Sequence, residues 1–296
     1  MENDKPLVSI VTPSYNQGKF IEDTLLSVVN QDYPNIEHLV IDGGSNDNTI
    51  EVLKNYEKKY NLRWVSEPDE GQSDAVNKGF KMAKGGIVGW LNSDDVYFDT
   101  TVISYVVDKF EELKHANVIY GDFVIIDRSG SIQKVVRTPN WNYERLLRTC
   151  FIGQPATFFR RKVVLENRLD KNLHLSMDYE FWLRLGENYN FTKVNKVLAG
   201  FRVYEDTKSF SNKEKQRIES KGLMAKYGQD FGLRYHIARF FDKLLFGYAR
   251  LKGIKDILEL TNAEDLAFKA KIPSKFTRIK NQIPLKDAWE LLTSKF

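Results

Sequence analysis

Four short segments of the sequence place polar or acidic side chains directly after an apolar run. They are Thr12–Asn16, Asp42–Ser45, Glu67–Gly71 and Asn92–Asp95. Three of them carry carboxylates, which repel one another when they converge unless a cation or a hydrogen-bond donor lies among them. The adjacent Asp94 and Asp95 supply hard oxygen ligands of the type that Mg²⁺ or Mn²⁺ prefers. Because a magnesium-type ion is seldom held by protein alone, the pair also predicts a ligand with phosphate groups.

Two further side chains fit a nucleotide that would carry those phosphates. Asp42 is expected to accept a hydrogen bond from a ring N–H, such as that of uracil, and Tyr15 offers an aromatic face to a base. An isolated Asp-Asp pair is most often a turn or a helix N-cap. The order and spacing of all four segments argue against that simpler interpretation.

The elements that must position these segments alternate between strand and helix. Apolar runs predict strands at Leu7–Val11, Glu37–Ile41, Leu62–Val65 and Ile87–Leu91. Helical periodicity predicts helices at Phe20–Asn30, Asn48–Tyr60, Asp74–Ala83 and Thr101–Leu113. This alternation indicates an α/β fold with a Rossmann-like, mostly parallel sheet and helices on both faces. Ligands bind at the carboxyl ends of such strands, which is where all four segments fall.

The pattern changes after residue 115. Val118–Ile126 and Ile132–Arg137 are predicted to form a hairpin around Asp127–Gly130, and short helices and strands follow to about residue 204. From Lys213 the chain has a basic, helical pattern. We therefore predict a nucleotide-binding half at 1–115, an acceptor-binding half at 116–212 and a helical C-terminal extension at 213–296.

Composition and charge narrow the function classes. Residues 1–212 hold 26 basic and 30 acidic side chains, whereas residues 213–296 hold 18 basic and 10 acidic ones. The hydrophobic content of 42% is that of a globular protein and excludes a disordered chain. The single cysteine, Cys150, excludes an intrachain disulfide and is expected to be buried. No signal peptide or membrane-spanning run is recognised, so we expect a cytoplasmic protein.

Several nucleotide-binding motifs are missing. The sequence has no Gly-x-x-x-x-Gly-Lys-[Ser/Thr] loop, which excludes a P-loop NTPase. No Gly-x-Gly-x-x-Gly follows the first strand, which argues against a dinucleotide-dependent oxidoreductase. Ser14–Gly18 also lacks the basic, glycine-rich character of a sugar nucleotidyltransferase, so that class is only a third possibility.

The sequence resembles the family 2 glycosyltransferases, which have the GT-A fold. The matching motifs are Val8–Asn16, Ile41–Ser45 with Asp47 and Thr49, Asp69–Gly71, Ser93–Asp95, Gln154–Phe158 with Arg160 and Arg161, and Met177–Arg184. The resemblance covers about residues 5–211. It implies an inverting enzyme that moves a sugar from a nucleoside diphosphate donor, first of all a UDP-sugar, to a hydroxyl of a saccharide or lipid-linked saccharide. Polysaccharide or glycan assembly is the expected process.

The resemblance also implies roles for individual residues. The expected contacts of the donor nucleotide are Thr12, Pro13, Tyr15, Asp42, Asp74 and Asp94. Asp95 is the expected ligand of Mn²⁺ or Mg²⁺, and Asp178 is the expected general base, with Glu180 as the fallback. Asp178 also fits a plain helix start, because it precedes the amphipathic run Tyr179–Leu185.

Other candidates surround this set. Gln154 is expected on the acceptor or sugar side, although a loop turn would also explain it, and Trp141 is a candidate for stacking on a sugar ring. Arg202 and Lys208 are candidates for diphosphate oxygens, with plain surface charge as the alternative.

One position departs from the family pattern. Many relatives carry a metal-binding His in an Arg-x-His-like context, where this sequence has Tyr204. None of the four histidines replaces it plausibly. Metal binding would then rest on Asp95, the diphosphate and water. The departure keeps open the alternative of a non-catalytic nucleotide-sugar or glycan-binding subunit.

The basic extension needs a separate explanation. In residues 231–255 a bulky apolar helix face lies opposite Arg239, Lys243 and Arg250, which is typical of a helix at a membrane interface. A helix packed on the transferase domain or on a second subunit is the alternative. Peripheral contact with the inner face of the cell membrane would suit a lipid-linked acceptor. Nucleic acid is not expected as a partner, because the basic residues accompany a large apolar face.

Overall fold

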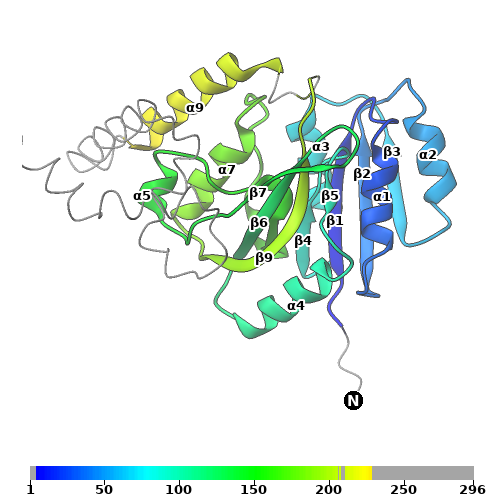
Figure 1. Ribbon diagram of the computed structural model, residues 1–296, viewed down its shortest axis with the longest axis horizontal. Helices are drawn as coiled ribbons and strands as arrows, with labels where there is room; N and C mark the ends of the chain where they lie inside the picture. The colour runs from blue at the N-terminus through cyan, green and yellow to red at the C-terminus, as the bar shows by residue number, and fades with distance from the viewer. Residues whose placement is uncertain (1–4, 206, 208–210, 229–296) are drawn as a thin grey trace, which may run out of the picture. The chain divides into compact units, whose positions relative to one another are not determined.

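The computed structural model describes residues 5–205, 207 and 211–228, all within one compact unit (Figure 1). Its strands are β1 Val8–Ser14, β2 Ile36–Asp42, β3 Leu62–Ser66, β4 Ile87–Trp90, β5 Val96–Tyr97, β6 Val118–Ile126, β7 Ile132–Val136, β8 Thr157–Arg160 and β9 Phe191–Arg202. Its helices are α1 Ile21–Val29, α2 Thr49–Tyr56, α3 Gln72–Met82, α4 Val102–Glu112, α5 Tyr143–Leu146, α6 Arg161–Glu166, α7 Met177–Gly186 and α9 Lys213–Gly228, with a 3₁₀ turn η1 at Gln154–Ala156.

All nine described strands belong to one sheet. Its order is β3-β2-β1-β4-β8-β6-β9-β5, and β7 pairs with β6. The four strands β3, β2, β1 and β4 are parallel, as the sequence predicts. Beyond β4 the sheet is mixed, because β8 runs antiparallel to both β4 and β6, while β6 and β9 are parallel. The expectation of a mostly parallel sheet therefore holds for the first half only.

The two faces of the sheet bury different sets of side chains. Val8 and Ile10 of β1 join one core cluster, in which α1 and α4 cover the sheet. Val11 points to the other face, against α3. A Cβ on Gly79 of α3 would lie 2.2 Å from Val11 Cγ1, so glycine is what lets α3 approach β1 this closely. Alternation along one strand thus places helices on both faces.

A layer of aromatic side chains packs α7 against α3 and the sheet. Phe80 of α3 packs edge-on against Trp90 at the end of β4 and stacks against Phe181 of α7. Phe159 of β8 stacks on Trp182 of α7. All five rings are fully or almost fully buried. These contacts hold the beginning of α7 at a defined place relative to the carboxyl end of β4.

The predicted elements of the first half and the hairpin around Asp127–Gly130 are confirmed. Cys150, expected to be buried, is exposed as a whole residue between α5 and η1, yet burial raises the pKa of its thiol well above the ordinary value. Among the described residues, no helix has the length and apolar character needed to cross a bilayer. The predicted interfacial helix at 231–255 lies outside the described residues.

Candidate functional site

The four segments at the carboxyl ends of β1 to β4 form the predicted rim of the sheet. The first two of these rim segments are tied together by their own polar groups. The backbone N–H of Asn16 donates to Ser45 Oγ over 2.7 Å, and Asn46 N–H donates to Asn16 Oδ1 over 2.9 Å. Asn16 has a φ of 53°, a left-handed conformation that asparagine tolerates better than most residues. The carboxyl ends of β1 and β2 therefore form one connected surface.

Asp42, at the end of β2, holds this surface together through hydrogen bonds. Its completely buried carboxylate accepts hydrogen bonds from the backbone N–H groups of Gly44 and Ser45 and from the hydroxyls of Ser45 and Ser66. These contacts let Asp42 shape the loop at the end of β2. Its bond to a base stays a prediction.

Thr12 and Pro13 are likewise buried within β1. Thr12 Oγ1 lies 2.9 Å from His38 Nε2, and His38 Nδ1 lies 2.7 Å from the Tyr60 hydroxyl. Burial lowers the pKa of His38 to about 3, so its imidazole is neutral at pH 7. Thr12 thus supports the loop through a buried polar chain.

Tyr15 and its neighbours are the part of this loop that can meet a ligand. The Tyr15 side chain is 59% exposed, as a base-stacking ring requires. Ser14 Oγ and Gln17 Oε1 are buried and have no hydrogen-bond partner among the described residues. Buried polar atoms are rarely left unpaired, so these two atoms fit a polar ligand at the end of β1.

The acidic loop after β4 holds one buried and one more accessible carboxylate. Asp95 is completely buried, and its Oδ1 accepts the backbone N–H of Arg202 over 2.8 Å. Burial, and next the charge of Asp94, raise the pKa of Asp95 well above its ordinary value. Asp94 is half-buried, so it presents the more accessible oxygens of the pair.

Arg202, at the end of β9, holds this loop in place. Its guanidinium donates to the carbonyl oxygens of Asp94, Asp127 and Arg128, and to Asp23 Oδ2 over 2.8 Å. The side chain is only 1% exposed. Because its donors already have protein partners, this arrangement speaks against the predicted contact with diphosphate. Lys208, the other predicted diphosphate contact, lies outside the described residues.

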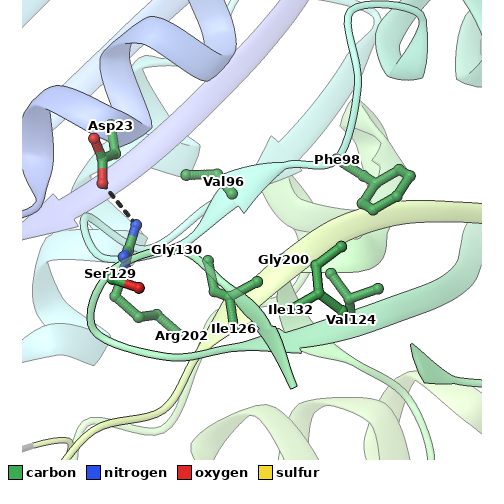
Figure 2. Close-up of a pocket in the computed structure, with 10 residues that line it drawn as sticks. All are labelled: Asp23, Val96, Phe98, Val124, Ile126, Ser129, Gly130, Ile132, Gly200 and Arg202. Carbon is green, nitrogen blue, oxygen red and sulfur yellow. Dashed lines mark hydrogen bonds and ion pairs between the residues drawn. The ribbon is translucent and has the colours of Figure 1, made fainter. Parts of the chain in front are cut away.

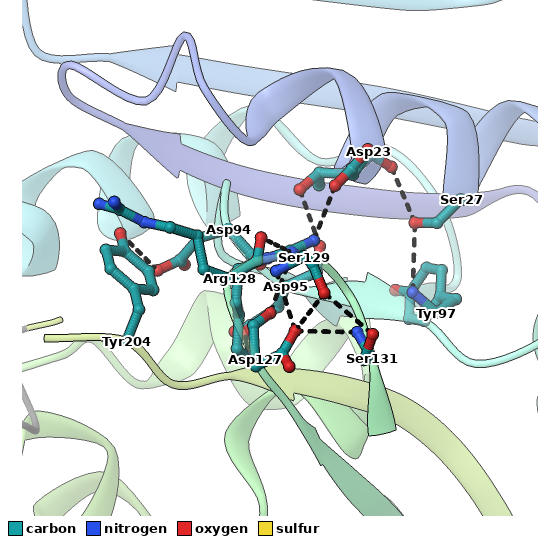
Figure 3. Close-up of polar contacts among 12 residues, drawn as sticks. Asp23, Ser27, Asp94, Asp95, Tyr97, Asp127, Arg128, Ser129, Ser131 and Tyr204 are labelled. Carbon is teal, nitrogen blue, oxygen red and sulfur yellow. Dashed lines mark hydrogen bonds and ion pairs between the residues drawn. The ribbon is translucent and has the colours of Figure 1, made fainter. Parts of the chain in front are cut away.

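Tyr204, which stands where the sequence resemblance leads us to expect a histidine, lies next to the acidic loop. Its hydroxyl lies 3.4 Å from Asp94 Oδ2, and its ring packs against Phe20. The exposed Arg128 places its guanidinium 5.5 Å from the centre of the Tyr204 ring (Figure 3). From the sequence alone Arg128 is only part of a hairpin turn, and the pairing of β6 with β9 brings it to Tyr204.

An amide network that the sequence analysis missed joins the acidic loop to η1. Asn92 Oδ1 accepts from Gln72 Nε2 over 2.9 Å and from Trp90 Nε1 over 3.0 Å. Its Nδ2 donates to Gln154 Oε1 over 2.8 Å, and Gln154 Nε2 donates to the Trp90 carbonyl oxygen. The predicted sugar-side residue Gln154 is therefore directly connected to the loop of Asp94 and Asp95. Asn92 precedes the acidic pair in the same segment, and this position is the signal from which the network could have been predicted.

Asp178 lies in the first turn of α7, and α3 connects this turn to the acidic loop. Gln72 contacts Asn92, while the next residue, Ser73, places its Oγ 3.0 Å from Met177 Sδ. Burial raises the pKa of Asp178 to about 6, although the backbone N–H of Tyr179 donates to its Oδ1 and opposes the shift. Asp178 is thus a protonatable carboxylate in a turn that α3 connects to the loop of the predicted metal ligand, and its role as the base stays a prediction.

Two predicted residues have strong protein partners. Asp74, in the first turn of α3, pairs with Lys171 over 2.6 Å and with Lys78, and the bond from Lys171 lowers its pKa. The Trp141 ring stacks on Phe191 with 4.2 Å between ring centres. No bond described here links Asp74 or Trp141 directly to the acidic loop. Their roles with donor and acceptor stay predictions.

A pocket of about 340 Å³ lies between α1, β5, the β6–β7 hairpin and β9 (Figure 2). Its walls include the ion pair of Asp23 with Arg202 and the apolar side chains of Phe98, Ile126 and Ile132. Among the predicted site residues that the structure describes, only Arg202 lines it. The pocket therefore borders the support of the acidic loop rather than the loop's own ligand-facing side.

The donor set fits a divalent cation that shares its coordination with a ligand. The described residues contain no cluster of three or more His, Cys, Asp or Glu side chains able to hold a metal. Asp94 and Asp95 would supply oxygen ligands. Burial, and next the charge of Asp94, raise the pKa of Asp95, and a cation would offset the repulsion between the two carboxylates. Phosphate oxygens and water would complete the coordination, as Mg²⁺ usually requires.

Comparison with known proteins identifies the domain. The model of the family described as "Glycosyl transferase family 2" matches residues 9–168, more than half of the chain. The chain belongs to glycosyl transferase family 2. The matched residues include all four rim segments and Gln154 and end before Asp178. The glycosyltransferase domain that the sequence resemblance predicts is confirmed.

Relatives and solved structures agree with this assignment. The putative teichuronic acid biosynthesis glycosyltransferase TuaG of Bacillus subtilis is 29% identical over 221 residues, covering 73% of this chain and 86% of TuaG. A chondroitin synthase of Pasteurella multocida is 28% identical over 214 residues, 72% of this chain. That match covers 22% of the synthase. A match to a glycosyltransferase of Rickettsia bellii covers 31% of that relative, so the chain spans a third or less of the length of these two proteins.

The fold likeness is clear at low sequence identity. S. aureus TarS 1–349, solved with UDP-GlcNAc, has a TM-score of 0.62 and 22% identity, covering 75% of this chain and 66% of that one. The mannosyltransferase PcManGT from Pyrobaculum calidifontis, solved with GDP-Man and Mn²⁺, has a TM-score of 0.60 and 15% identity, covering 99% and 89%. The predicted GT-A fold is confirmed.

Proposed function

We propose that this chain transfers a sugar from a nucleoside diphosphate donor, first of all a UDP-sugar, to a hydroxyl of a saccharide acceptor, with inversion at the anomeric carbon. The observation that carries the proposal is Asp178, a half-buried carboxylate with a pKa of about 6 that α3 connects to the acidic loop. The likeness to TuaG and to the UDP-GlcNAc complex of TarS supports a UDP-sugar and a surface glycan.

Asp178 carries the proton transfer in this proposal. At pH 7 a carboxylate with a pKa of about 6 is mostly ionised, yet it is a stronger base than an ordinary aspartate. It accepts the proton of the acceptor hydroxyl as the acceptor oxygen bonds to the anomeric carbon. The bond from that carbon to the diphosphate oxygen breaks on the opposite side, so one displacement inverts the configuration.

The donor is bound by groups on the β1 and β4 loops. The exposed ring of Tyr15 stacks on the base, and Ser14 Oγ and Gln17 Oε1 offer buried polar contacts. Asp94 and Asp95 would hold Mg²⁺ or Mn²⁺. When bound, that cation stabilises the negative charge that develops on the leaving diphosphate. The PcManGT complex with Mn²⁺ supports a divalent cation in such a fold.

The test separates donor binding from turnover. Asp178→Asn should lower the rate of UDP release and transfer by at least about 100-fold, because it removes the base. The same variant should still be stabilised against heat by UDP with Mn²⁺, as the wild type is. Asp95→Ala should lose both turnover and this stabilisation. Asp170→Asn, at an exposed aspartate in the segment before α7, is the matched control and should resemble the wild type.

Two outcomes would contradict the proposal. Turnover that survives in Asp178→Asn would remove the base from the mechanism. A wild-type chain that binds nucleoside diphosphate sugars but neither transfers nor hydrolyses any of them would favour the alternative of a binding subunit.

A further inference from the structure

Helix α9 packs across the turn that opens α7. Glu219 Oε1 accepts hydrogen bonds from the backbone N–H of Ser176 over 3.0 Å and of Leu175 over 3.4 Å. Ser220 Oγ lies 2.8 Å from Ser176 Oγ, and Gln216 Nε2 donates to the Leu175 carbonyl oxygen over 3.2 Å. Three side chains on one face of α9 therefore hold the two residues that precede Met177 and Asp178.

A second contact fixes α9 further along α7. The Tyr227 hydroxyl donates to Glu180 Oε1 over 2.6 Å. Arg184 donates to the same oxygen over 2.9 Å and to Glu180 Oε2 over 3.0 Å. Glu180 is almost completely buried, so this link is shielded from solvent. With anchors at both ends, α9 cannot slide along α7 without breaking several polar contacts.

The contact with Glu219 also places a charge near Asp178. Ser176 makes no side-chain cap on α7, and Glu219 from a helix more than 40 residues away bonds the backbone there instead. Burial is the main cause of the raised pKa of Asp178, and the negative charge of Glu219 adds to it. Cys150, in the segment before η1, also interacts with Asp178, whose charge helps to raise the pKa of the Cys150 thiol.

We propose that Glu219 is a positioning residue for Asp178: its carboxylate fixes the turn that opens α7 and sets a second negative charge beside the base. The inference rests on the proposed role of Asp178 and extends it to a helix outside the matched family region. It makes α9 a part of the catalytic unit. Glu219 touches no reacting atom and acts only through Asp178.

The test uses the full chain with Glu219→Gln and Glu219→Ala. The glutamine keeps an oxygen that accepts from the two backbone N–H groups but removes the charge, whereas alanine removes both. Glu214→Gln is the matched control, since Glu214 is exposed on the same helix and pairs with Arg217. Each variant is measured by the ¹³C carboxyl titration of Asp178, identified by the signal lost in Asp178→Asn, and by the pH profile of kcat.

In Glu219→Gln we expect the pKa of Asp178 to fall by roughly 0.3–1 unit, with the acid limb of kcat moving to lower pH by the same amount. In Glu219→Ala we expect kcat to fall roughly 10-fold with the donor KM unchanged, because the base is less well held. Glu214→Gln should leave both readouts at their wild-type values.

An unchanged Asp178 titration and an unchanged kcat profile in both Glu219 variants would overturn the inference. The carboxyl titration needs no turnover, so it reports on Glu219 even if Asp178→Asn proves active. An active Asp178→Asn variant would contradict the proposed function, but the coupling between Asp178 and Glu219 would still be measurable. The two failures are therefore distinguishable.

Discussion

Asp178 and Asp95 are both carboxyl groups whose pKa is raised by burial, yet their surroundings suit them to different tasks. Asp95 lies beside a second carboxylate and accepts a backbone N–H from Arg202. Asp178 receives a backbone N–H from Tyr179, and its charged neighbour is Glu219. Adjacent carboxylates suit a cation, whereas a single carboxylate with a moderately raised pKa suits proton transfer.

The pH dependence of turnover should report Asp178. Because the base must be ionised and its pKa is about 6, kcat should fall tenfold for each pH unit below that value and level off above it. The measurement is kcat with saturating donor and acceptor from pH 4.5 to 8, with circular dichroism at each pH to confirm that the chain stays folded. An acid limb near pH 4 would mean that Asp178 is not the titrating group.

His38 should make the fold sensitive to acid. Its pKa is lowered to about 3 in the folded chain, against an ordinary value near 6.5, so the unfolded chain binds an extra proton between these values. The free energy of unfolding should then fall by about 1.4 kcal/mol for each pH unit from pH 6.5 downward, on top of the contribution of other groups.

Urea unfolding at pH 7 and pH 5 measures this effect. His38→Asn should be less stable than the wild type at pH 7, since it breaks the chain from Thr12 to Tyr60, but should lose less stability between the two pH values. His115→Asn, at an exposed histidine, is the control and should keep the wild-type slope. An equal loss in all three proteins would show that His38 titrates normally.

At the scale of elements, the end of β9 supports the acidic loop. Strand β9 pairs with both β6 and β5, so its last residue, Arg202, reaches the hairpin turn, the β4–β5 loop and Asp23 of α1 together. Five donor–acceptor contacts meet at this residue, one from its backbone and four from its guanidinium. The geometry of Asp94 and Asp95 therefore depends on a strand that follows them by a hundred residues.

Replacing Arg202 should cost stability first. Arg202→Met removes the guanidinium and leaves three carbonyl oxygens without their donor, so we expect the chain to lose about 2–4 kcal/mol of unfolding free energy. Arg217→Met, on the exposed face of α9, should leave the free energy of unfolding close to the wild-type value. An Arg202→Met protein with wild-type stability and weakened UDP binding would restore the diphosphate role that the sequence predicts.

At the scale of the molecule, sequence patterns predicted the strands and helices that depend on residues close together in the chain. Strand and helix periodicity located β1 to β4 and their helices. Because ligands bind at the carboxyl ends of parallel strands, the four rim segments were predicted to lie together. The placement of β8 between β4 and β6 depends on distant pairing and was not predictable from periodicity. For the same reason the sequence could not show the protein partners of Arg202, which are carbonyl oxygens and Asp23 from distant parts of the chain.

The predicted first half, residues 1–115, should not fold as a separate unit. Its core shares one cluster with Ile119 of β6, Phe158 of β8 and Leu198 of β9, and β4 would become an uncovered sheet edge. We expect the fragment to lack a cooperative urea transition, whereas fragment 1–235 keeps one. A cooperative transition in the short fragment, monitored by Trp64 and Trp90 fluorescence, would show that the halves are independent.

The ion pair of Asp23 with Arg202 joins residues 179 positions apart in sequence. During synthesis on the ribosome the chain emerges from its N-terminus, so Asp94 and Asp95 appear long before the residue that fixes their loop. Until β9 has left the exit tunnel, the acidic loop lacks its guanidinium support and its β5 pairing. A nascent chain is therefore expected to acquire the proposed cation affinity late and abruptly, once the tunnel has released Arg202.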